Sequence, residues 1–279
     1  MERAGFKACF SRDSPSLACM ATVGSKPARG YTFSMSSESS DPLRVPLLDL
    51  IDNDGLPRTE PHPCSYLPRK AVTEGFRSQV LHGETYHDLM DRGFRRSGSI
   101  FYRPRCPSCN ACVQMRVPVA DFKPGKSQRR VLKKNEDVRL RISRLNLTPA
   151  KVLLYARYLD YQHPGSPQTG DAESLRDFLY ENVVDSREVS YFVDDRLIGV
   201  SILDVCSRSV STVYHFFEPD EAWRSLGVYS VLREIELTRT LEIPFYYMGY
   251  WIQGCGKMDY KASYRPHEVM IDGEWERVE

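Results

Sequence analysis

The fold is decided by residues 189–217, which read VSYFVDDRLIGVSILDVCSRSVSTVYHFF. Apolar and β-branched side chains form three runs in this stretch, at 189–193, 197–205 and 209–217, with short polar turns between them. Runs of this length bounded by turn residues predict three consecutive antiparallel strands.

Two helices are predicted ahead of these strands. Residues 149–161 follow Thr148, a favoured N-cap residue, and begin with a proline, which suits the first helical position. Residues 172–184 follow Asp171, another favoured N-cap residue. The second half of the chain therefore opens with a pair of helices.

A helix and a last strand are predicted after the three strands. Residues 225–241 place apolar side chains along one side of a helix, and residues 245–251 form an aromatic run typical of a strand. The order helix, helix, hairpin, strand, helix, strand is similar to that of the Gcn5-related acyltransferase core. We therefore predict an α+β fold with an acyltransferase-like C-terminal domain at residues 146–279. This likeness does not by itself assign a function.

The first half is predicted to form a smaller, cysteine-containing N-terminal domain at residues 45–145. Apolar spacing predicts a helix over 73–91, and alternating runs predict strands at 99–102 and 113–119. Residues 1–44 contain a serine-rich segment and no periodic apolar pattern. We interpret them as a disordered extension or as sequence upstream of a misassigned start.

The composition is that of a chain with a packed core. Of its 279 residues, 41% are apolar and 27% are charged, which excludes wholesale disorder. No apolar stretch approaches the roughly 18 residues that a membrane-spanning helix needs, so no membrane partner is expected. The start of the chain lacks the apolar segment of a secretion signal. We expect a cytoplasmic location and reduced thiols.

Charge is distributed unevenly along the chain. Residues 64–145 contain 18 Lys and Arg against 7 Asp and Glu, whereas residues 146–279 contain 13 against 22. A basic half joined to an acidic half indicates an anionic partner for the first. The alternative is an ordinary solvated surface whose halves neutralise each other.

Four cysteines form a candidate metal site, namely Cys106, Cys109 and Cys112 with Cys64 upstream. In a reducing compartment this spacing favours metal ligation over disulfides. Four thiolates suit zinc or an iron–sulfur cluster. The alternative is that they are free thiols or small buried residues. No cysteine has an evident base beside it, so no thiol nucleophile is expected.

A basic run is the candidate nucleic-acid contact. Its cations would bind phosphates in a salt-dependent way, and nearby aromatic residues could stack on unpaired bases. The alternative is a charged helix face in solvent. The candidate tRNA-binding residues are Lys126, Arg129, Arg130, Lys133 and Lys134.

The segment from Arg224 to Gly227 opens a predicted helix, where backbone N–H groups can face an anion. It partly matches the acetyl-CoA fingerprint R/Q-x-x-G-x-G/A, but the last position is Tyr229. We expect its ring to obstruct a pyrophosphate, which favours an acyltransferase core without coenzyme. The alternative is a plain helix start.

Two further stretches with candidate functional residues, 214–220 and 249–261, lie at the ends of predicted strands. His215 is a candidate general base, because its ordinary pKa lies near neutrality, although a structural role is equally common. Lys257 and Lys261 are four residues apart, and on one helical face they would bind a phosphate or a carboxylate. The alternative interpretation is that the two lysines are an ordinary pair on the protein surface.

These motifs, taken together, resemble one family. They are Cys64-Ser-Tyr-Leu-Pro68, Gly93-Phe-Arg-Arg-Ser-Gly98, Tyr102-Arg-Pro-Arg-Cys106, Cys109-Asn-Ala-Cys112, Ser127-Gln-Arg-Arg130, Val213-Tyr-His-Phe-Phe217, Arg224-Ser-Leu-Gly227, Gly249-Tyr-Trp-Ile252 and Lys257-Met258 with Tyr260-Lys261. In this order they resemble the arginyl-tRNA–protein transferase family over residues 60–275. The length and the cysteine loop resemble its bacterial aspartate/glutamate leucyltransferase branch.

The resemblance implies a transferase of the N-degron (N-end rule) pathway of protein degradation. It would join leucine from leucyl-tRNA to the N-terminal amine of proteins that begin with Asp or Glu. Eukaryotic relatives transfer arginine and carry a C-G-Y-C motif, which here reads Cys64-Ser-Tyr-Leu67. An aminoacyl ester is already activated, so no cofactor is required for transfer, and zinc or an iron–sulfur cluster at the cysteines is optional.

The resemblance and this chemistry assign candidate roles. The reaction needs a neutral amine close to the ester carbonyl and stabilisation of the oxyanion. Expected catalytic residues are His215, Tyr250 and Lys257. An acidic acceptor side chain needs a cationic partner. Expected substrate-binding residues are Arg95, Arg96, Phe217, Arg224, Gly227, Trp251 and Lys261.

Three alternatives stay open. The first is arginyl transfer by the same chemistry, and the second is a CoA-dependent N-acyltransferase. The third is a non-enzymatic RNA-binding module with a cysteine-bound metal, which leaves the strand-end motifs of the second half without a purpose.

Overall fold

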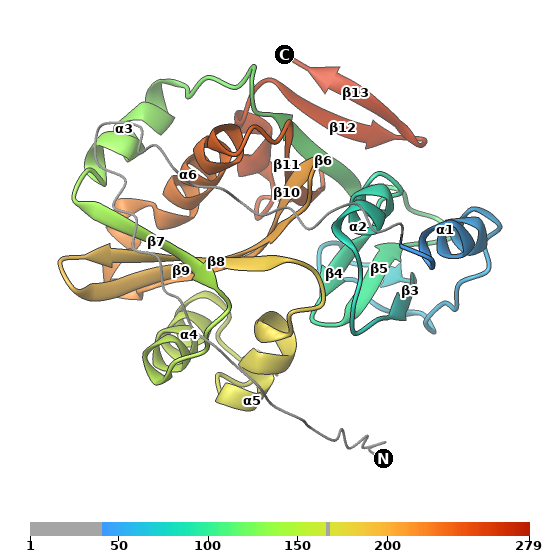
Figure 1. The fold of residues 1–279 in the computed structure, drawn as a ribbon, viewed down its shortest axis with the longest axis horizontal. Coiled ribbons are helices and arrows are strands. Elements are labelled where there is room, and N and C mark those ends of the chain that lie inside the picture. Colours follow the sequence, from blue (N-terminus) through green and yellow to red (C-terminus); the bar gives the residue numbers. More distant parts are fainter. Residues whose placement is uncertain (1–40, 166–167) are drawn as a thin grey trace.

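The computed structural model describes residues 41–165 and 168–279 (Figure 1). Of the extension predicted at 1–44, residues 1–40 lie outside the described residues, and Arg44 begins helix α1 (Arg44–Asp52). The described residues form three sheets, the smallest of which pairs β1 (His62–Pro63) with β2 (Lys70–Ala71). Among the helices of this part of the chain, none has the length and apolar content to cross a membrane.

An eight-stranded sheet forms the body of the molecule, in the order β13-β12-β6-β11-β10-β9-β8-β7. Only β10 and β11 are parallel, and the other neighbours are antiparallel. The strands predicted within 189–217 and at 245–251 are confirmed. The eight strands are β6 (Val113–Pro118), β7 (Val138–Arg144), β8 (Ser186–Val193), β9 (Arg196–Val205), β10 (Ser209–Phe217), β11 (Phe245–Trp251), β12 (His267–Ile271) and β13 (Glu274–Val278).

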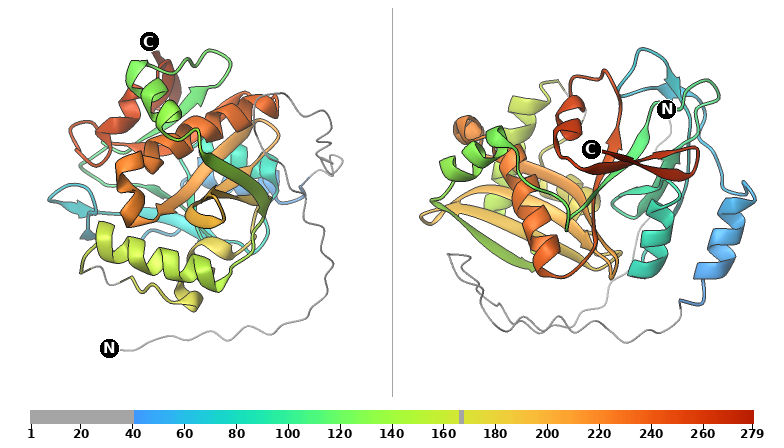
Figure 2. Two further views of the ribbon diagram at one scale, coloured as in Figure 1. Left: turned by 90° about the vertical axis from the view of Figure 1, so that its left-hand side faces the viewer. Right: turned by 90° about the horizontal axis from the view of Figure 1, so that it is seen from above.

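Helices cover both faces of this sheet (Figures 1 and 2). On one face α6 (Leu226–Thr240) contributes Leu232 to a core cluster shared with β11. On the other face α4 (Pro149–Gln162) contributes Leu154 to a second cluster shared with β10. The predicted helices at 149–161 and 225–241 are confirmed, and with them the α+β class and the predicted order of elements.

The helix predicted at 172–184 is shorter than expected. Asp171 caps it as predicted, because its Oδ1 accepts hydrogen bonds from the amides of Glu173 and Ser174 at 2.9 Å. Helix α5 (Ala172–Leu175) passes into the π-helical turn η1 (Arg176–Tyr180), and the chain is extended from the next residue. The chain must turn after Tyr180 to enter β8. The helix therefore ends before the apolar pattern in the sequence ends.

The helix predicted over 73–91 is wrong in its first half. Thr73–Arg77 is strand β3, which pairs with β5 (Ile100–Pro104), and β5 pairs with β4 (Arg95–Ser97). Only Gly83–Met90 is helical, as α2. Phe76 stacks on Phe101 across the strands, with ring centroids 5.3 Å apart. Cross-strand packing therefore overrides an apolar spacing that also fits a helix.

Two strands of the first half belong to the large sheet. β6, predicted at 113–119, lies between β12 and β11, and β7 forms an edge beside β8. The predicted strand at 99–102 is likewise confirmed, as β5 of the small sheet. The large sheet thus includes residues on both sides of the domain boundary that we predict at residue 145.

Candidate functional site

Strands β10 and β11 lie side by side only at their start. Ser209–Ser211 pair with Phe245–Tyr247, and no further pair joins the two strands within the described residues. Both strands then continue, to Phe217 and Trp251. Each has a bulge directly after the paired residues. Bulges bend strands and re-aim side chains, often beside active sites. We call the region directly after the last pair, Ser211 with Tyr247, where the two strands separate, the strand parting.

Arg95 reaches the strand parting from β4. Its Nη1 donates to Ser211 Oγ at 2.7 Å, and its Nη2 donates to the carbonyl oxygen of Thr212. The guanidinium also lies against Gly249 of β11, where an added Cβ would stand 3.3 Å from Nε. Arg95 thereby contacts both strands where they separate.

Lys261 reaches the same place from the 3-10 helix η3 (Asp259–Ser263). Its Nζ donates to the carbonyl oxygens of Met248 at 2.8 Å and Tyr250 at 2.6 Å. Burial, together with the positive charge of Arg95, lowers the pKa of Lys261 to about 7. The two cations are therefore close enough to oppose each other.

Each strand carries a buried polar atom without a partner beyond the strand parting. On β10 this atom is His215 Nε2, and on β11 it is Trp251 Nε1, both unpartnered among the described residues. Buried polar groups are almost always hydrogen-bonded, so such atoms point to a ligand or to water. Phe217 stacks on the His215 ring with centroids 5.9 Å apart.

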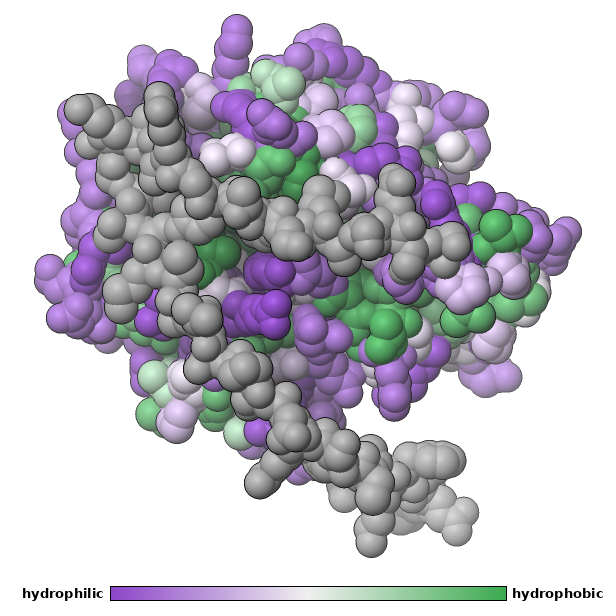
Figure 3. Space-filling view, in the orientation of Figure 1, coloured by the Kyte–Doolittle hydropathy of each residue, from purple (hydrophilic) through white to green (hydrophobic). Residues whose placement is uncertain are grey.

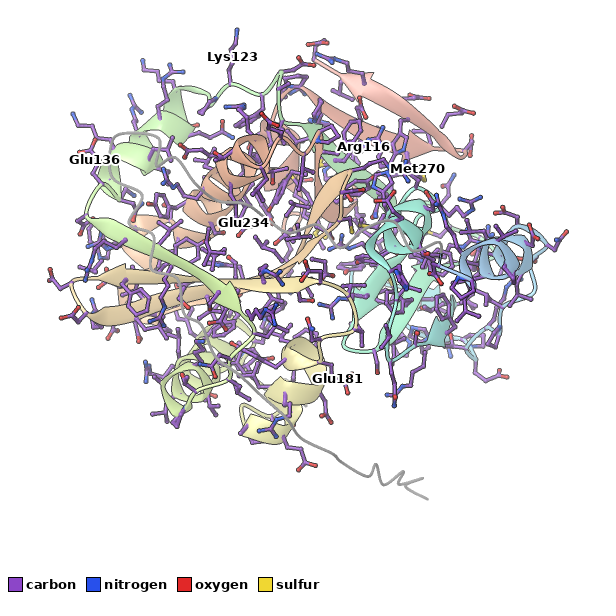
Figure 4. All side chains as sticks on the ribbon, in the orientation of Figure 1. Arg116, Lys123, Glu136, Glu181, Glu234 and Met270 are labelled. Atoms are coloured by element: carbon purple, nitrogen blue, oxygen red, sulfur yellow. The ribbon has the colours of Figure 1, made fainter. Side chains whose placement is uncertain are left out.

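A buried network supports His215 from beneath helix α6. Ser201 Oγ shares a hydrogen bond with His215 Nδ1 at 2.9 Å, and Tyr191 Oη lies 3.2 Å from Ser201 Oγ. Tyr191 and Tyr246 both donate to the carboxyl group of Glu234, which projects from α6 (Figure 4). Burial lowers the pKa of His215 to about 3 and raises that of Glu234. His215 is therefore neutral at physiological pH and a weak base.

Glu234 is the residue of this network that the sequence analysis missed. It lies on the buried side of α6 together with Val231, Ile235 and Thr238. A carboxylate at helical spacing within an apolar stripe is the signal that could have revealed it.

Arg96 and Tyr250 serve contacts inside the protein. Arg96 Nε and Nη2 each donate to the Asp204 carboxylate at 2.6 Å, with both side chains fully buried. This ion pair joins β4 of the small sheet to β9 of the large one. Tyr250 Oη donates to the carbonyl oxygen of Gly93 at 2.8 Å.

Lys257 lies apart from Lys261. It is exposed in the loop between β11 and η3, whereas Lys261 is buried. The two lysines therefore do not share one face, because the loop is not helical at Lys257.

The start of α6 is also occupied by internal contacts. Arg224 donates to the Asp137 carboxylate at 2.8 Å through both Nη atoms and to Glu221 at 2.5 Å. Gly227 faces open space. The expectation that Tyr229 blocks an anion is wrong: its ring packs in the core, 6.1 Å from the Tyr191 ring.

The predicted tRNA-binding residues lie on one exposed face of helix α3 (Lys126–Lys134), which packs beside α6. Its inward side carries Gln128, Val131 and Leu132. Lys123 and Glu136 lie just beyond its two ends in Figure 4, and the coloured residues along the left edge of Figure 3 are largely hydrophilic. Lys134 Nζ also donates to the carbonyl oxygen of Trp223 at 2.6 Å. The exposed cations of the helix are Lys126, Arg129, Arg130, Lys133 and Lys134.

The four predicted metal ligands line one cavity of about 710 Å³, together with Trp251. Backbone amides point at two of the sulfurs: Tyr66 N lies 3.5 Å from Cys64 Sγ, and Val72 N lies 3.4 Å from Cys106 Sγ. Burial and the neighbouring thiols raise the pKa of Cys112 to about 11. In the described part of the chain, no three His, Cys, Asp or Glu side chains stand in a metal-ligating arrangement.

The order of elements and the strand parting place the chain in the acyltransferase-like fold class, which by itself assigns no activity. Two family models identify it further: “Arginine-tRNA-protein transferase, N terminus” matches residues 62–130, and “Arginine-tRNA-protein transferase, C terminus” matches residues 150–271. The chain belongs to this family, as its motifs indicated, and is an aminoacyltransferase.

Individual relatives agree with the family models. The chain is 42% identical to the aspartate/glutamate leucyltransferase of Pseudomonas savastanoi pv. phaseolicola (strain 1448A / Race 6), over 78% of this chain and 94% of the relative. It is 39% identical to that of Pseudomonas aeruginosa (strain UCBPP-PA14), over the same shares.

Solved structures show weaker similarity. L-PGS from Bacillus licheniformis has a TM-score of 0.42 at 9% identity, covering 84% of this chain and 89% of its own. FemX has a TM-score of 0.41 at 8% identity, covering 75% and 68%. Similarity at this level adds nothing to the functional assignment.

Proposed function

We propose that the chain transfers leucine from leucyl-tRNA to the N-terminal amine of proteins that begin with Asp or Glu, in the cytoplasm, where aminoacyl-tRNAs are made. The observation that carries this proposal is the 42% identity to a relative named aspartate/glutamate leucyltransferase, over 94% of that relative. The exposed cations of α3 and the unpaired cations at the strand parting fit a tRNA and an acidic acceptor, respectively.

The reaction needs positioning more than chemical activation. The neutral amine attacks the carbonyl carbon of the aminoacyl ester, a C–N bond forms, and the ester C–O bond breaks. The proton lost by the amine leaves with the tRNA hydroxyl or with solvent. An α-amine with a pKa of about 8 is partly neutral at physiological pH, so a strong base is unnecessary.

The candidate catalytic residues are assigned roles that fit their surroundings. His215, held neutral by burial, would accept a hydrogen bond from the attacking amine through Nε2 and act little as a base. The buried Tyr250 would fix β11 against the small sheet, and the exposed Lys257 would approach the substrate from its loop. Trp251 and Phe217 would line the aminoacyl group, and Gly227 would leave room for the tRNA end beside Arg224.

The direct test is leucyl transfer. The protein, incubated with a mixed pool of aminoacyl-tRNAs and an Asp-initiated peptide, should extend the peptide by one leucine, as measured by mass spectrometry. Extension by arginine would assign the arginyl alternative. No extension by any amino acid would refute the proposal, and micromolar acetyl-CoA binding in calorimetry would then favour the CoA-dependent alternative.

We propose α3 as the main contact for the tRNA backbone. The triple variant K126A/R130A/K133A should raise the KM for leucyl-tRNA, because fewer phosphates are neutralised. The dependence of log affinity on log salt should flatten by about one unit per lost phosphate contact. Filter binding across a salt series measures both.

The matched control for α3 removes equal charge elsewhere. Arg77, Arg176 and Arg265 are exposed and lie outside α3, so R77A/R176A/R265A should leave the salt dependence nearly unchanged. Equal effects of the two triple variants would show that net charge alone attracts the tRNA.

We propose that Cys64, Cys106, Cys109 and Cys112 ligate zinc or an iron–sulfur cluster. Their common cavity and the amides pointing at two sulfurs support this, because amide donors stabilise metal-bound thiolates. Such a group would brace the segments that carry the cysteines; the transfer chemistry does not require it. Four thiolates are a suitable set of donors for zinc or an iron–sulfur cluster. Among the described residues, no three of these thiols stand in a metal-ligating arrangement, so binding would draw them together.

Protein purified without oxygen should contain about one zinc ion or one cluster per chain, as measured by elemental analysis and visible absorbance. Cys112→Ser should lose most of the metal and lower the melting temperature, while Cys206→Ser, whose thiol is buried outside this cavity, should retain it. Wild-type protein that is purified without oxygen and contains neither zinc nor a cluster would contradict the proposal.

A further inference from the structure

Among residues 41–165 and 168–279, the buried Lys and Arg side chains have acidic partners, with two exceptions. Arg96, Arg116, Lys151 and Arg224 are all buried, and each forms an ion pair. Arg95 and Lys261, each 7% exposed, contact only hydroxyl and carbonyl oxygens among the described residues. A buried charge without a counter-charge is costly, so these two cations are expected to meet an anion.

The two exceptions lie at one place. Arg95 bonds to β10 and Lys261 bonds to β11, both at or just after the last residue pair that joins the strands. Burial and, after it, the positive charge of Arg95 lower the pKa of Lys261, in agreement with repulsion between two nearby like charges. An anion between them would relieve it and restore the charge of Lys261.

Their remaining hydrogen-bond donors suit a carboxylate. A guanidinium has five N–H groups and an ammonium has three. Arg95 uses two in its hydrogen bonds to β10, and Lys261 uses two in its bonds to β11. Four donors therefore stay available, which matches the roughly four lone-pair sites of a carboxylate.

Two buried atoms without partners among the described residues follow the contacts of the two cations along the same strands, where we propose that the acceptor amine binds. His215 Nε2 and Trp251 Nε1, the unpartnered atoms, lie on the same two strands beyond the strand parting. In an N-terminal Asp or Glu, the side-chain carboxylate lies within a few bonds of the α-amine. Two cations near that amine would also favour its neutral, reactive form.

We propose that Arg95 and Lys261 together bind the side-chain carboxylate of the acceptor's N-terminal Asp or Glu and so determine acceptor specificity. This inference rests on the proposed function and names two of its specificity residues. Arg96, the neighbouring candidate, is excluded from this role because Asp204 already neutralises it.

The test is a binding cycle with fluorescent peptides that differ only in an N-terminal Asp or its neutral isostere Asn. Fluorescence anisotropy should show that Arg95→Gln and Lys261→Met each weaken binding of the Asp peptide about ten- to a hundredfold. Binding of the Asn peptide should change by less than about twofold, because it lacks the group that these cations contact.

Transfer kinetics give a second readout. Both variants should lose kcat/KM with the Asp peptide while the KM for leucyl-tRNA stays unchanged, and Arg95→Lys should recover part of the loss by keeping the charge. The urea midpoints of the variants identify any that fail to fold, and the exposed Arg77→Gln is the control for lost charge.

The outcomes distinguish a carboxylate-binding role of Arg95 and Lys261 from a structural role. Equal weakening for Asp and Asn peptides would overturn the proposal and indicate that the cations only hold the strands or stabilise the oxyanion. Unchanged binding in both variants would also overturn it. Wild-type protein that binds the Asp peptide selectively, but transfers no amino acid, would refute the proposed function and leave the carboxylate site standing.

Discussion

Arg96→Leu should lower the free energy of unfolding by about 3–5 kcal/mol, because it leaves a buried carboxylate without its counter-charge. Arg96 and Asp204 are fully buried and joined by two hydrogen bonds of 2.6 Å. Ser186 Oγ donates to the same carboxylate at 2.7 Å, and one hydroxyl cannot replace a guanidinium. Urea denaturation followed by circular dichroism measures the loss.

A double-mutant cycle isolates the ion pair. Asp204→Leu alone should destabilise by a similar amount, since it leaves a buried guanidinium unpaired, whereas R96L/D204L should recover much of the stability because no buried charge is left. Additive losses in the double variant would contradict this account and assign the cost to side-chain packing. The pair links β4 to β9, so its loss is expected to loosen the small sheet from the large one.

Gly249→Ala should reduce kcat/KM for leucyl transfer about a hundredfold while the protein stays folded. Gly249 has a φ of +77°, which strains any residue with a side chain. Its added Cβ would also stand 3.3 Å from Arg95 Nε, so the guanidinium must shift or the bulge must flatten. A misplacement of about 1 Å at a reacting centre can cost a hundredfold in rate. Steady-state kinetics with an Asp-initiated peptide measure the effect.

Gly165→Ala is the matched control, because Gly165 has a φ of +76° but no atom of the described residues within 4 Å of an added Cβ. It should lose a similar amount of stability and keep its transfer rate. Equal loss of activity in the two variants would show that backbone strain, and not the displacement of Arg95, reduces catalysis.

Local signals predicted most of the second half. Alternation and turn residues predicted the three strands within 189–217, and periodicity predicted the helix at 225–241 and the strand at 245–251, all near their observed bounds. The first half was harder to predict, because Phe76 fits an apolar helix stripe as well as a strand. Its stacking on Phe101, a contact between residues far apart in sequence, selects the strand.

In the candidate site, too, local sequence patterns do not determine which residues contact each other. Arg95 and Arg96 are adjacent, identical in type and part of one motif, and nothing local distinguishes them. In the fold, Arg96 meets Asp204, whereas Arg95 meets only uncharged oxygens at the strand parting. Lys257 and Lys261 separate in the same way, since one lies in an exposed loop and the other is buried.

The sequence by itself determined the family, the α+β class and the chemical types available for the reaction, because these depend on motifs and on periodicities that span a few residues. Only the tertiary structure decided which cations are neutralised inside the protein and which remain for a substrate. The physical reason is that the cost of a buried charge depends on the groups that surround it in space, and those groups come from strands and helices distant along the chain.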